Sequence, residues 1–263
     1  MNKIPEIFNN VVVDLKRLQE IDAMPEPRIR YIVAITPRSG SSYLCNTMIG
    51  AKLFGRPGEA LNQSFVGGNL KRIPGRTPDE YIRNAIRVRK TANKISGLKT
   101  SWFQFQNFME AMHDHAYLDG FKYIYLTRRD LAAQAVSLYK ATSSNVFHTN
   151  IQHSEDALAK LDALEYDYEA IKGWHDHIVA QEKGWQDYFY NKRIFPLCIS
   201  YEDIEEDIVR VLKRIATYIA VNPDNVSIPE EPSVFTKVSD SRNAEWSRRF
   251  MMDYSSSKEL ENK

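Results

Sequence analysis

The sequence predicts an α/β fold: a P-loop-like parallel sheet flanked by helices, with an added N-terminal helix. Residues 31–35 (YIVAI) and 121–127 (FKYIYLT) form two short apolar runs rich in β-branched or aromatic side chains, which is typical of buried strands. Segments with helical spacing of apolar residues alternate with these runs. Strands that alternate with helices indicate a parallel sheet covered on both faces, and such sheets bind ligands beyond the carboxyl ends of their strands.

The remaining elements follow from the same periodicities. Apolar residues recur at helical spacing from Ile4 to Ile21, and Thr77 stands where it can cap a helix over residues 78–91. Residues 142–155 are polar and irregular, which is typical of a loop or lid, and no element is assigned after Pro229. The further predicted helices span residues 43–54, 102–116, 130–141, about 157–190 and 204–219, and the further strands span residues 94–98 and 194–200.

Length and composition bound the domain organisation and the partners. The 263 residues suit one large domain, and the Pro-flanked segment 24–27 separates an N-terminal helical extension (1–27) from a main domain (28–263). The formal net charge of +1 gives no global bias toward nucleic acid or an acidic membrane surface. No apolar run reaches the length of a signal peptide or a membrane span, so we expect a cytoplasmic protein.

The two cysteines, Cys45 and Cys198, lie in apolar stretches, and we expect both to be buried, reduced thiols. Two cysteines are too few for a disulfide framework or a four-cysteine zinc site. The sequence also contains no obvious carboxylate or histidine cluster of the kind that holds a metal ion. We therefore expect no metal site.

The turn after the first predicted strand has the composition of an anion site, and it reads Thr36-Pro37-Arg38-Ser39-Gly40-Ser41-Ser42. A strand-to-helix turn presents backbone N–H groups and the positive end of a helix to an anion. Gly40 permits close backbone approach, the serine hydroxyls donate hydrogen bonds, and Arg38 adds a planar, charged fork. The Walker A pattern is absent, as is the cysteine of a thiol phosphatase. On these residues alone, a serine-rich helix cap with an incidental arginine explains the turn equally well.

Three further segments follow this turn in order: Gly55-Arg56-Pro57-Gly58-Glu59, Thr127-Arg128-Arg129-Asp130-Leu131-Ala132-Ala133-Gln134-Ala135-Val136-Ser137-Leu138 and Arg242-Asn243-Ala244-Glu245-Trp246. Together the four segments resemble the motifs of the Stf0 family, which are bacterial carbohydrate sulfotransferases, over about residues 30–250. The resemblance implies a sulfotransferase that takes its sulfuryl group from PAPS (3′-phosphoadenosine-5′-phosphosulfate), releases PAP (the 3′,5′-bisphosphate) and uses no metal. It also implies that the 5′-phosphosulfate is bound by Pro37, Arg38, Ser39, Gly40, Ser41 and Ser42.

A second phosphate site is expected near the same rim of the sheet. Arg128 ends the second clear strand and Ser137 lies in the helix that follows, and the resemblance implies that both hold the 3′-phosphate of PAPS. The alternatives are a surface ion pair between Arg128 and Asp130 and a helical serine that bonds to its own backbone. Arg129 stands where some family members have proline, and it remains open whether it shares or replaces the role of Arg128.

The resemblance suggests that a C-terminal segment folds over the nucleotide. In this segment Arg242 is the candidate phosphate ligand and Trp246 the candidate packing residue, with Lys237 as a further donor. The alternative is a core tryptophan beside solvated basic residues.

The candidate general base is Glu59, at the position of the family's catalytic glutamate. A helix from about Ser42 to Leu53 carries the chain roughly 18 Å away from the rim. Residues 54–59 return roughly 20 Å only if they are nearly straight. Lys99 follows a short strand and, with Arg38, is a candidate to stabilise charge on the transferring group. The alternatives are a loop glutamate paired with Arg56, a surface lysine, and a base supplied instead by one of two lid histidines, His148 and His153.

The acceptor is expected to be a small hydroxylated molecule, such as a sugar or glycolipid precursor. Residues 60–63 (ALNQ) stand where the trehalose-sulfating members carry aromatics, so the acceptor itself stays open. Two rival functions are a P-loop-like kinase that uses ATP and a non-catalytic module that binds PAPS or phosphate. The N-terminal residues lie outside the resemblance, and a homodimer formed through them is possible.

Overall fold

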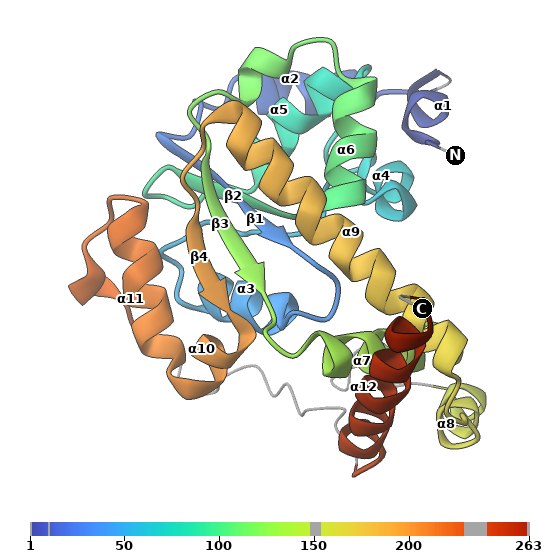
Figure 1. Cartoon of the computed structure of the whole chain (residues 1–263). Helices are drawn as coiled ribbons and strands as arrows, with labels where there is room; N and C mark the ends of the chain where they lie inside the picture. Colours follow the sequence, from blue (N-terminus) through green and yellow to red (C-terminus); the bar gives the residue numbers. More distant parts are fainter. Residues whose placement is uncertain (1, 10, 148–153, 229–240, 262–263) are drawn as a thin grey trace.

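A four-stranded parallel sheet forms the centre of the molecule, in the order β2-β1-β3-β4 (Figure 1). The computed structural model describes residues 2–9, 11–147, 154–228 and 241–261. All three strand pairings are parallel, which confirms the predicted α/β fold. The strands are β1 (Ile29–Ile35), β2 (Ile95–Ser101), β3 (Lys122–Thr127) and β4 (Leu197–Ser200).

Helices cover both faces of the sheet, because the side chains of each strand alternate between two apolar cores. Ile32, Leu98 and Tyr123 point into one core, and Val33 and Leu126 point into the other. In Figure 1, α9 lies obliquely across the first face. The helices of the first core are α5 (Pro78–Val88), α6 (Trp102–Ala111) and α9 (Tyr168–Lys192), and those of the second are α3 (Ser41–Gly50) and α11 (Ile208–Tyr218).

Two helices that the sequence predicts as continuous are each divided by a capping aspartate. The predicted helix over about 157–190 is α8 (Glu155–Asp162) followed by α9, which starts where the Asp167 carboxylate accepts a hydrogen bond from the Ala170 N–H. The predicted helix over 204–219 is α10 (Tyr201–Glu206) followed by α11, whose cap is Asp207. A side-chain cap competes with helix continuation, and apolar periodicity does not register it.

The other helix boundaries shift by a few residues. Helix α6 ends at Ala111 and a 3₁₀ helix (His115–Leu118) replaces the rest of the predicted helix over 102–116. Helix α7 (Leu131–Ser144) includes three residues that were predicted as loop. The predicted cap Thr77 is confirmed, since its side chain accepts a hydrogen bond from the Glu80 N–H. The lid histidines, His148 and His153, lie outside the described residues.

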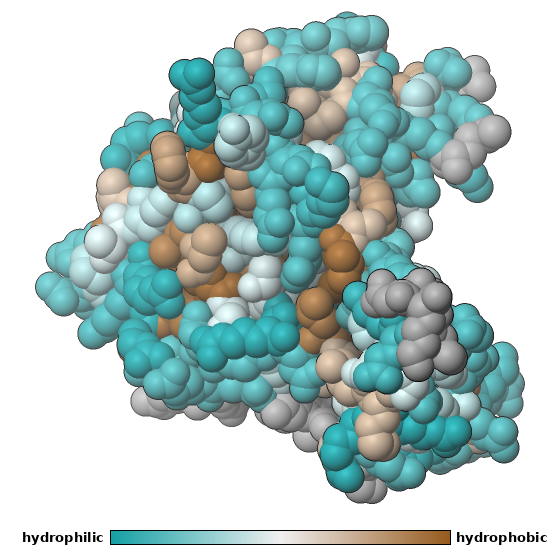
Figure 2. All heavy atoms as spheres, in the orientation of Figure 1, coloured by the Kyte–Doolittle hydropathy of each residue, from teal (hydrophilic) through white to brown (hydrophobic). Residues whose placement is uncertain are grey.

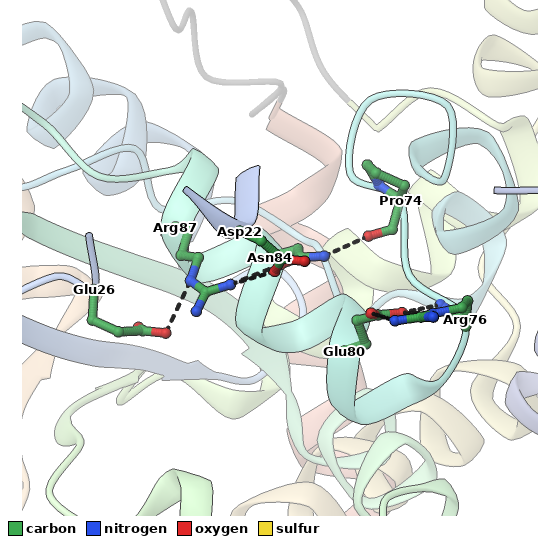
Figure 3. Close-up of polar contacts among 7 residues, drawn as sticks. All are labelled: Asp22, Glu26, Pro74, Arg76, Glu80, Asn84 and Arg87. Carbon is green, nitrogen blue, oxygen red and sulfur yellow. Dashed lines mark hydrogen bonds and ion pairs between the residues drawn. The ribbon is translucent and has the colours of Figure 1, made fainter. Parts of the chain in front are cut away.

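The N-terminal extension contains two short helices instead of one, α1 (Ile4–Asn9) and α2 (Leu15–Asp22). It packs on the main domain, because Ile4 and Phe8 are buried in the core that contains α5 and α6. Figure 3 shows the polar anchor: the Arg87 guanidinium on α5 lies 2.8 Å from Asp22 and 3.0 Å from Glu26. One turn earlier, the buried Asn84 amide donates to the Pro74 carbonyl at 2.8 Å, and Arg76 pairs with Glu80.

The last helix, α12 (Ser241–Glu261), lies in a segment to which no element was assigned from the sequence, and it packs on α7 and α9 at the carboxyl side of the sheet (Figure 1). Trp246 and Phe250 are buried there in a third apolar cluster with residues of α7 and α9. This packing makes Trp246 part of a core, as the alternative interpretation of the sequence held.

Cys45 is buried as predicted, but the prediction for Cys198 is wrong, since this residue is exposed. Cys198 lies on β4, an edge strand of the sheet in the described part of the chain, where packing is less complete than at the central strands. Figure 2 shows apolar atoms gathered around this edge, between α11 and α9, on a face that is otherwise mostly hydrophilic. Across the described parts of the chain, no helix has the length and apolarity needed to span a bilayer.

Candidate active site

The two predicted phosphate sites lie at the same edge of the sheet. The chain passes from β1 to β2 on one side and then crosses to β3 on the other side of β1, so the winding direction reverses between β1 and β3. Open parallel sheets form their ligand crevice at such a reversal, beyond the carboxyl ends of the strands. The anion turn (36–40) follows β1 and Arg128 follows β3, and these two segments flank that point.

Two residues of the anion turn have an unusual backbone conformation. Arg38 and Gly40 have φ angles of 64° and 79°, in the left-handed region. Gly40 is required, because a Cβ atom there would lie 2.6 Å from the Tyr201 ring. The hydroxyl of Ser39 is buried and donates to the Thr36 carbonyl at 2.7 Å. This leaves the backbone of the turn and the N-terminus of α3 to face an anion, since the first N–H groups of a helix have no acceptor within it.

Arg38 connects the first predicted site to the second. Its Nε donates to Ser137 Oγ on α7 at 3.0 Å, and its Nη1 donates to the Phe147 carbonyl at 2.6 Å. Burial lowers the pKa of the Arg38 guanidinium, and the nearby positive charge of Arg128 lowers it further. The two guanidinium groups are thus close enough for their positive charges to repel each other, and such a pair is a candidate to bind an anion.

Arg128 and Arg129 differ in their contacts. The Arg128 guanidinium lies over the Tyr201 ring, 4.6 Å from its centroid, and its buried Nε has no hydrogen-bond partner among the described residues. Arg129 is engaged elsewhere, since its Nη2 lies 2.8 Å from Asp203. No ion pair joins Arg128 to Asp130 among the described residues, and the Asp130 carboxylate accepts a hydrogen bond from the Ala133 N–H.

Glu59 and Lys99, the two predicted catalytic residues on the β2 side, form an ion pair with 2.8 Å between Lys99 Nζ and Glu59 Oε1. The same ammonium donates to Ser42 Oγ in the first turn of α3 at 3.3 Å, so it bridges the carboxylate and the anion turn. The other carboxylate oxygen of Glu59 accepts from the Asn62 amide at 3.0 Å. Lys99 is almost fully buried and Glu59 is 30% exposed, so the carboxylate keeps an open side.

The chain reaches Glu59 by the straight path that the sequence required. Residues 55–58 run along the free edge of β2, from Gly55 beside the Ile95 carbonyl to Gly58, whose carbonyl accepts from the Lys99 N–H at 3.0 Å. This path returns the chain from the far end of α3 to the carboxyl edge of the sheet. Beneath the pair, burial raises the pKa of Cys45 to about 11, while the Lys99 charge lowers it and the Glu59 charge raises it.

Arg242 lies at the start of α12, and its contact with Asp162 joins α12 to α8. Its Nη1 donates to the Asp162 carbonyl at 2.9 Å, and its guanidinium lies 6.0 Å from the centre of the Trp246 ring. The structure therefore brings the anion turn close to Ser137, Arg128, Lys99 and Glu59, and it places Arg242 in contact with α8. Lys237 lies outside the described residues.

Comparison with protein families gives one match over most of the chain: the model of the Stf0 sulphotransferase family fits residues 30–253. The chain belongs to the Stf0 sulfotransferase family. It is therefore a sulfotransferase, as the four segments suggested. A curated relative, trehalose 2-sulfotransferase of Mycolicibacterium smegmatis, is 22% identical over 85% of this chain and 94% of its own length.

Two solved sulfotransferase structures are similar to this chain at low sequence identity. The sulfotransferase of Alicyclobacillus acidocaldarius is 15% identical, with a TM-score of 0.45 over 86% of this chain and 92% of its own. A mouse sulfotransferase, SULT7A1, solved in complex with PAP, is 17% identical, with a TM-score of 0.38 over 90% of this chain and 70% of its own.

Three residues of this Stf0 sulfotransferase support the anion turn without having been predicted for the site. Tyr201 fills the space over Gly40 and lies under Arg128. The Gln134 amide donates to the Pro37 carbonyl at 2.6 Å, and the Trp185 indole donates to the Ile35 carbonyl at 3.1 Å. Tyr201 was detectable in principle, because it directly follows a strand, where the residues of this edge are found.

Proposed function

We propose that this Stf0 sulfotransferase transfers a sulfuryl group from PAPS to a hydroxyl of a small, carbohydrate-like acceptor, by in-line displacement with Glu59 as the general base. The observation that supports this best is the contact between Arg38 and Ser137 beside Arg128. One nucleotide with a 5′-phosphosulfate and a 3′-phosphate carries the two anionic groups that such neighbouring pockets would bind.

In this proposal the donor is held mainly by groups that follow two strands, β1 and β3. The backbone of residues 37–42 and the N-terminus of α3 bind the 5′-phosphosulfate, and Arg128 and Ser137 bind the 3′-phosphate. The orphaned Nε of Arg128 and the desolvated guanidinium of Arg38 are the features that fit an anionic ligand. Arg242 is proposed as a further phosphate ligand, supplied from α12.

In the proposed reaction, Glu59 accepts the proton of the acceptor hydroxyl as its oxygen forms a bond to sulfur. The bond between sulfur and the bridging oxygen of the donor breaks, and PAP leaves with the electron pair. Arg38 and Lys99 stabilise the charge that develops on the sulfuryl and leaving phosphate groups. Because Lys99 pairs with Glu59 and contacts Ser42, it stands between the base and the anion turn.

A carbohydrate-like acceptor is supported by the relatives, which are named trehalose 2-sulfotransferases. The aromatic residues that those enzymes carry after the catalytic glutamate are replaced here by residues 60–63 (ALNQ). We therefore propose a sugar or glycolipid precursor other than trehalose as the acceptor. The test is a screen of hydroxylated metabolites with PAPS, read by mass spectrometry for the gain of one SO₃ group, and an unchanged mass for every acceptor would count against it.

The two alternative functions differ from a sulfotransferase in the product that each would form. A kinase would add a phosphoryl group from ATP, and a non-catalytic module would bind PAP without turnover. The positive charges of Arg38 and Arg128 favour PAPS, since ATP has a hydroxyl in place of the 3′-phosphate.

The proposal also includes a cytoplasmic location, a domain boundary near residue 27 and a homodimer formed through the N-terminal helices. Size-exclusion chromatography with light scattering tests the homodimer.

A further inference from the structure

Arg89, the C-cap residue of α5, contacts residues 55–58 on the side that faces away from β2. This segment leads directly to Glu59. The Arg89 Nη1 donates to the Arg56 carbonyl at 3.1 Å. Backbone and side-chain bonds already join the same stretch to the end of α5: the Arg56 N–H donates to the Arg89 carbonyl at 3.0 Å, and the Arg56 guanidinium donates to the Val88 carbonyl at 2.8 Å. The guanidinium of Arg89 is therefore an addition to an attachment that exists without it.

The same guanidinium packs directly on Gly58. A Cβ atom at Gly58 would lie 2.6 Å from Arg89 Nη1, so the two groups are in contact only because residue 58 has no side chain. On the other side of the segment, the Gly58 carbonyl accepts from the Lys99 N–H at 3.0 Å. Gly58 is thus clamped between Arg89 and β2, and the next residue is Glu59, whose carboxylate meets Lys99.

Arg89 is expected to lower the stability of the fold at this position. Its Nε is fully buried and has no hydrogen-bond partner, and no carboxylate pairs with the guanidinium among the residues that the structure describes. Burial lowers the pKa of Arg89, which is the mark of a charge placed where solvation is poor. A partly desolvated charge without a counter-ion destabilises a fold, and an apolar side chain of similar length is better tolerated there.

We propose that Arg89 is a positioning residue for sulfuryl transfer: its guanidinium presses Gly58 against β2 and so fixes Glu59 in register with Lys99. The inference rests on the proposed function for the role of Glu59, but the packing of Arg89 on Gly58 does not. It predicts that Arg89 favours turnover at the expense of stability. A residue with a purely structural role would show the opposite, because its removal would lower stability and activity together.

The first test compares Arg89→Met with wild type, and with Lys90→Met as a matched control that removes a positive charge from the neighbouring position. Because the backbone bonds to Arg56 persist, we expect Arg89→Met to fold, with an equal or higher melting temperature. We expect kcat to fall by about 10-fold or more, since a small misplacement of a catalytic group is costly. The KM for PAPS should stay unchanged, because the Arg89 guanidinium contacts Arg56 and Gly58 and not the anion turn. The control Lys90→Met should behave as wild type. A normal kcat, or a melting temperature that falls with kcat, would overturn the proposal.

Two further variants test the contact itself. Arg89→Lys keeps the charge but lacks the planar fork, so it should lower kcat much as Arg89→Met does. Gly58→Ala should also lower kcat, because its Cβ displaces the guanidinium. In the double variant Gly58→Ala/Arg89→Met, the alanine should cost little more, because its clash partner is gone. Full additivity of the two losses would show that Arg89 and Gly58 act independently.

A readout without turnover separates this inference from the proposed function. Hydrogen–deuterium exchange should rise in Arg89→Met at residues 55–62 and at the Lys99 amide, and nowhere else. If that rise occurs in a protein that binds no PAP and sulfates no acceptor, the positioning role stands and the proposed function fails. If the wild type sulfates an acceptor but exchange and kcat are unaltered in Arg89→Met, the proposed function stands and the positioning role fails.

Discussion

Arg38 Nε, on the turn after β1, donates a hydrogen bond of 3.0 Å to Ser137 Oγ, in the second turn of α7. The two residues come from the two segments that were assigned to different phosphates of one nucleotide. Their contact places the two segments beside each other at one rim of the sheet. The account of donor binding depends on this contact and on Arg128, whose charge acts on Arg38.

The exchange of Glu59 for glutamine tests the base. The variant Glu59→Gln keeps the shape and the amide contact to Asn62 but cannot accept a proton, so we expect kcat to fall by about 10²- to 10⁴-fold. PAP affinity, measured by calorimetry, should remain close to wild type, because the donor pocket does not include residue 59. Unaltered turnover in Glu59→Gln would remove Glu59 from the mechanism.

Substitutions of the adjacent residues Arg128 and Arg129 test the proposed 3′-phosphate site, with Arg129 as the matched control. Arg128→Gln should weaken PAP binding by about 10- to 100-fold, since it removes a charge-assisted hydrogen bond in a partly buried pocket. Arg129→Gln should leave PAP affinity nearly unchanged, because it breaks only the exposed ion pair with Asp203. Titration calorimetry on both variants decides between them, and the reverse ranking would assign the phosphate to Arg129.

Two glycine-to-alanine substitutions should have opposite effects on stability. Gly40→Ala adds a Cβ 2.6 Å from the Tyr201 ring at a φ of 79°, so we expect it to destabilise the fold by about 1–3 kcal/mol and to weaken PAP binding. Gly67→Ala, in α4 (Gln63–Asn69), meets no atom within 4 Å and should stabilise the fold by up to about 1 kcal/mol. Thermal unfolding with and without PAP measures both, and equal effects would mean that the turn tolerates a side chain.

The buried thiol of Cys45 gives stability a dependence on alkaline pH. Its pKa rises from 9.0 to about 11 in the native state, so the folded protein keeps a proton that the unfolded chain releases. Stability should therefore fall as pH rises from about 9 toward 11, with a loss of about 1.4 kcal/mol at pH 10 from this group. Cys45→Ala should lose less stability between pH 8 and pH 10 than wild type. Parallel losses in both proteins would show that the thiol does not titrate in this way.

Much of the site was predictable because it consists of residues at strand ends. Strands β1 and β3 were located by their apolar runs, and the rule for parallel sheets then predicted the turn at Gly40 and Arg128 at one edge. Strand β2 was predicted over 94–98 and spans Ile95–Ser101, so Lys99 lies within it. The straight return to Glu59 was anticipated from chain length alone, and the structure shows it along β2. These features depend on local composition and on covalent reach, which a single sequence contains.

The features that were missed depend on contacts between distant segments. The breaks at Asp167 and Asp207 are side-chain caps inside apolar periodicity, and the exposure of Cys198 follows from the position of β4 at the edge of the sheet. The sequence places Tyr201 directly after a predicted strand, but its position beside Arg128 depends on the pairing of Thr127 with Ser200. The desolvation of the Arg89 guanidinium likewise depends on the residues packed around it.

The most direct test of donor binding compares PAP with ADP by titration calorimetry on the wild-type protein. The two ligands share adenosine and a 5′-phosphate, but only PAP has the 3′-phosphate that Arg128 and Ser137 are proposed to hold. The account predicts that PAP binds at least about 10-fold more tightly than ADP, which corresponds to one charge-assisted contact or more. Equal affinities, or tighter binding of ADP, would contradict it.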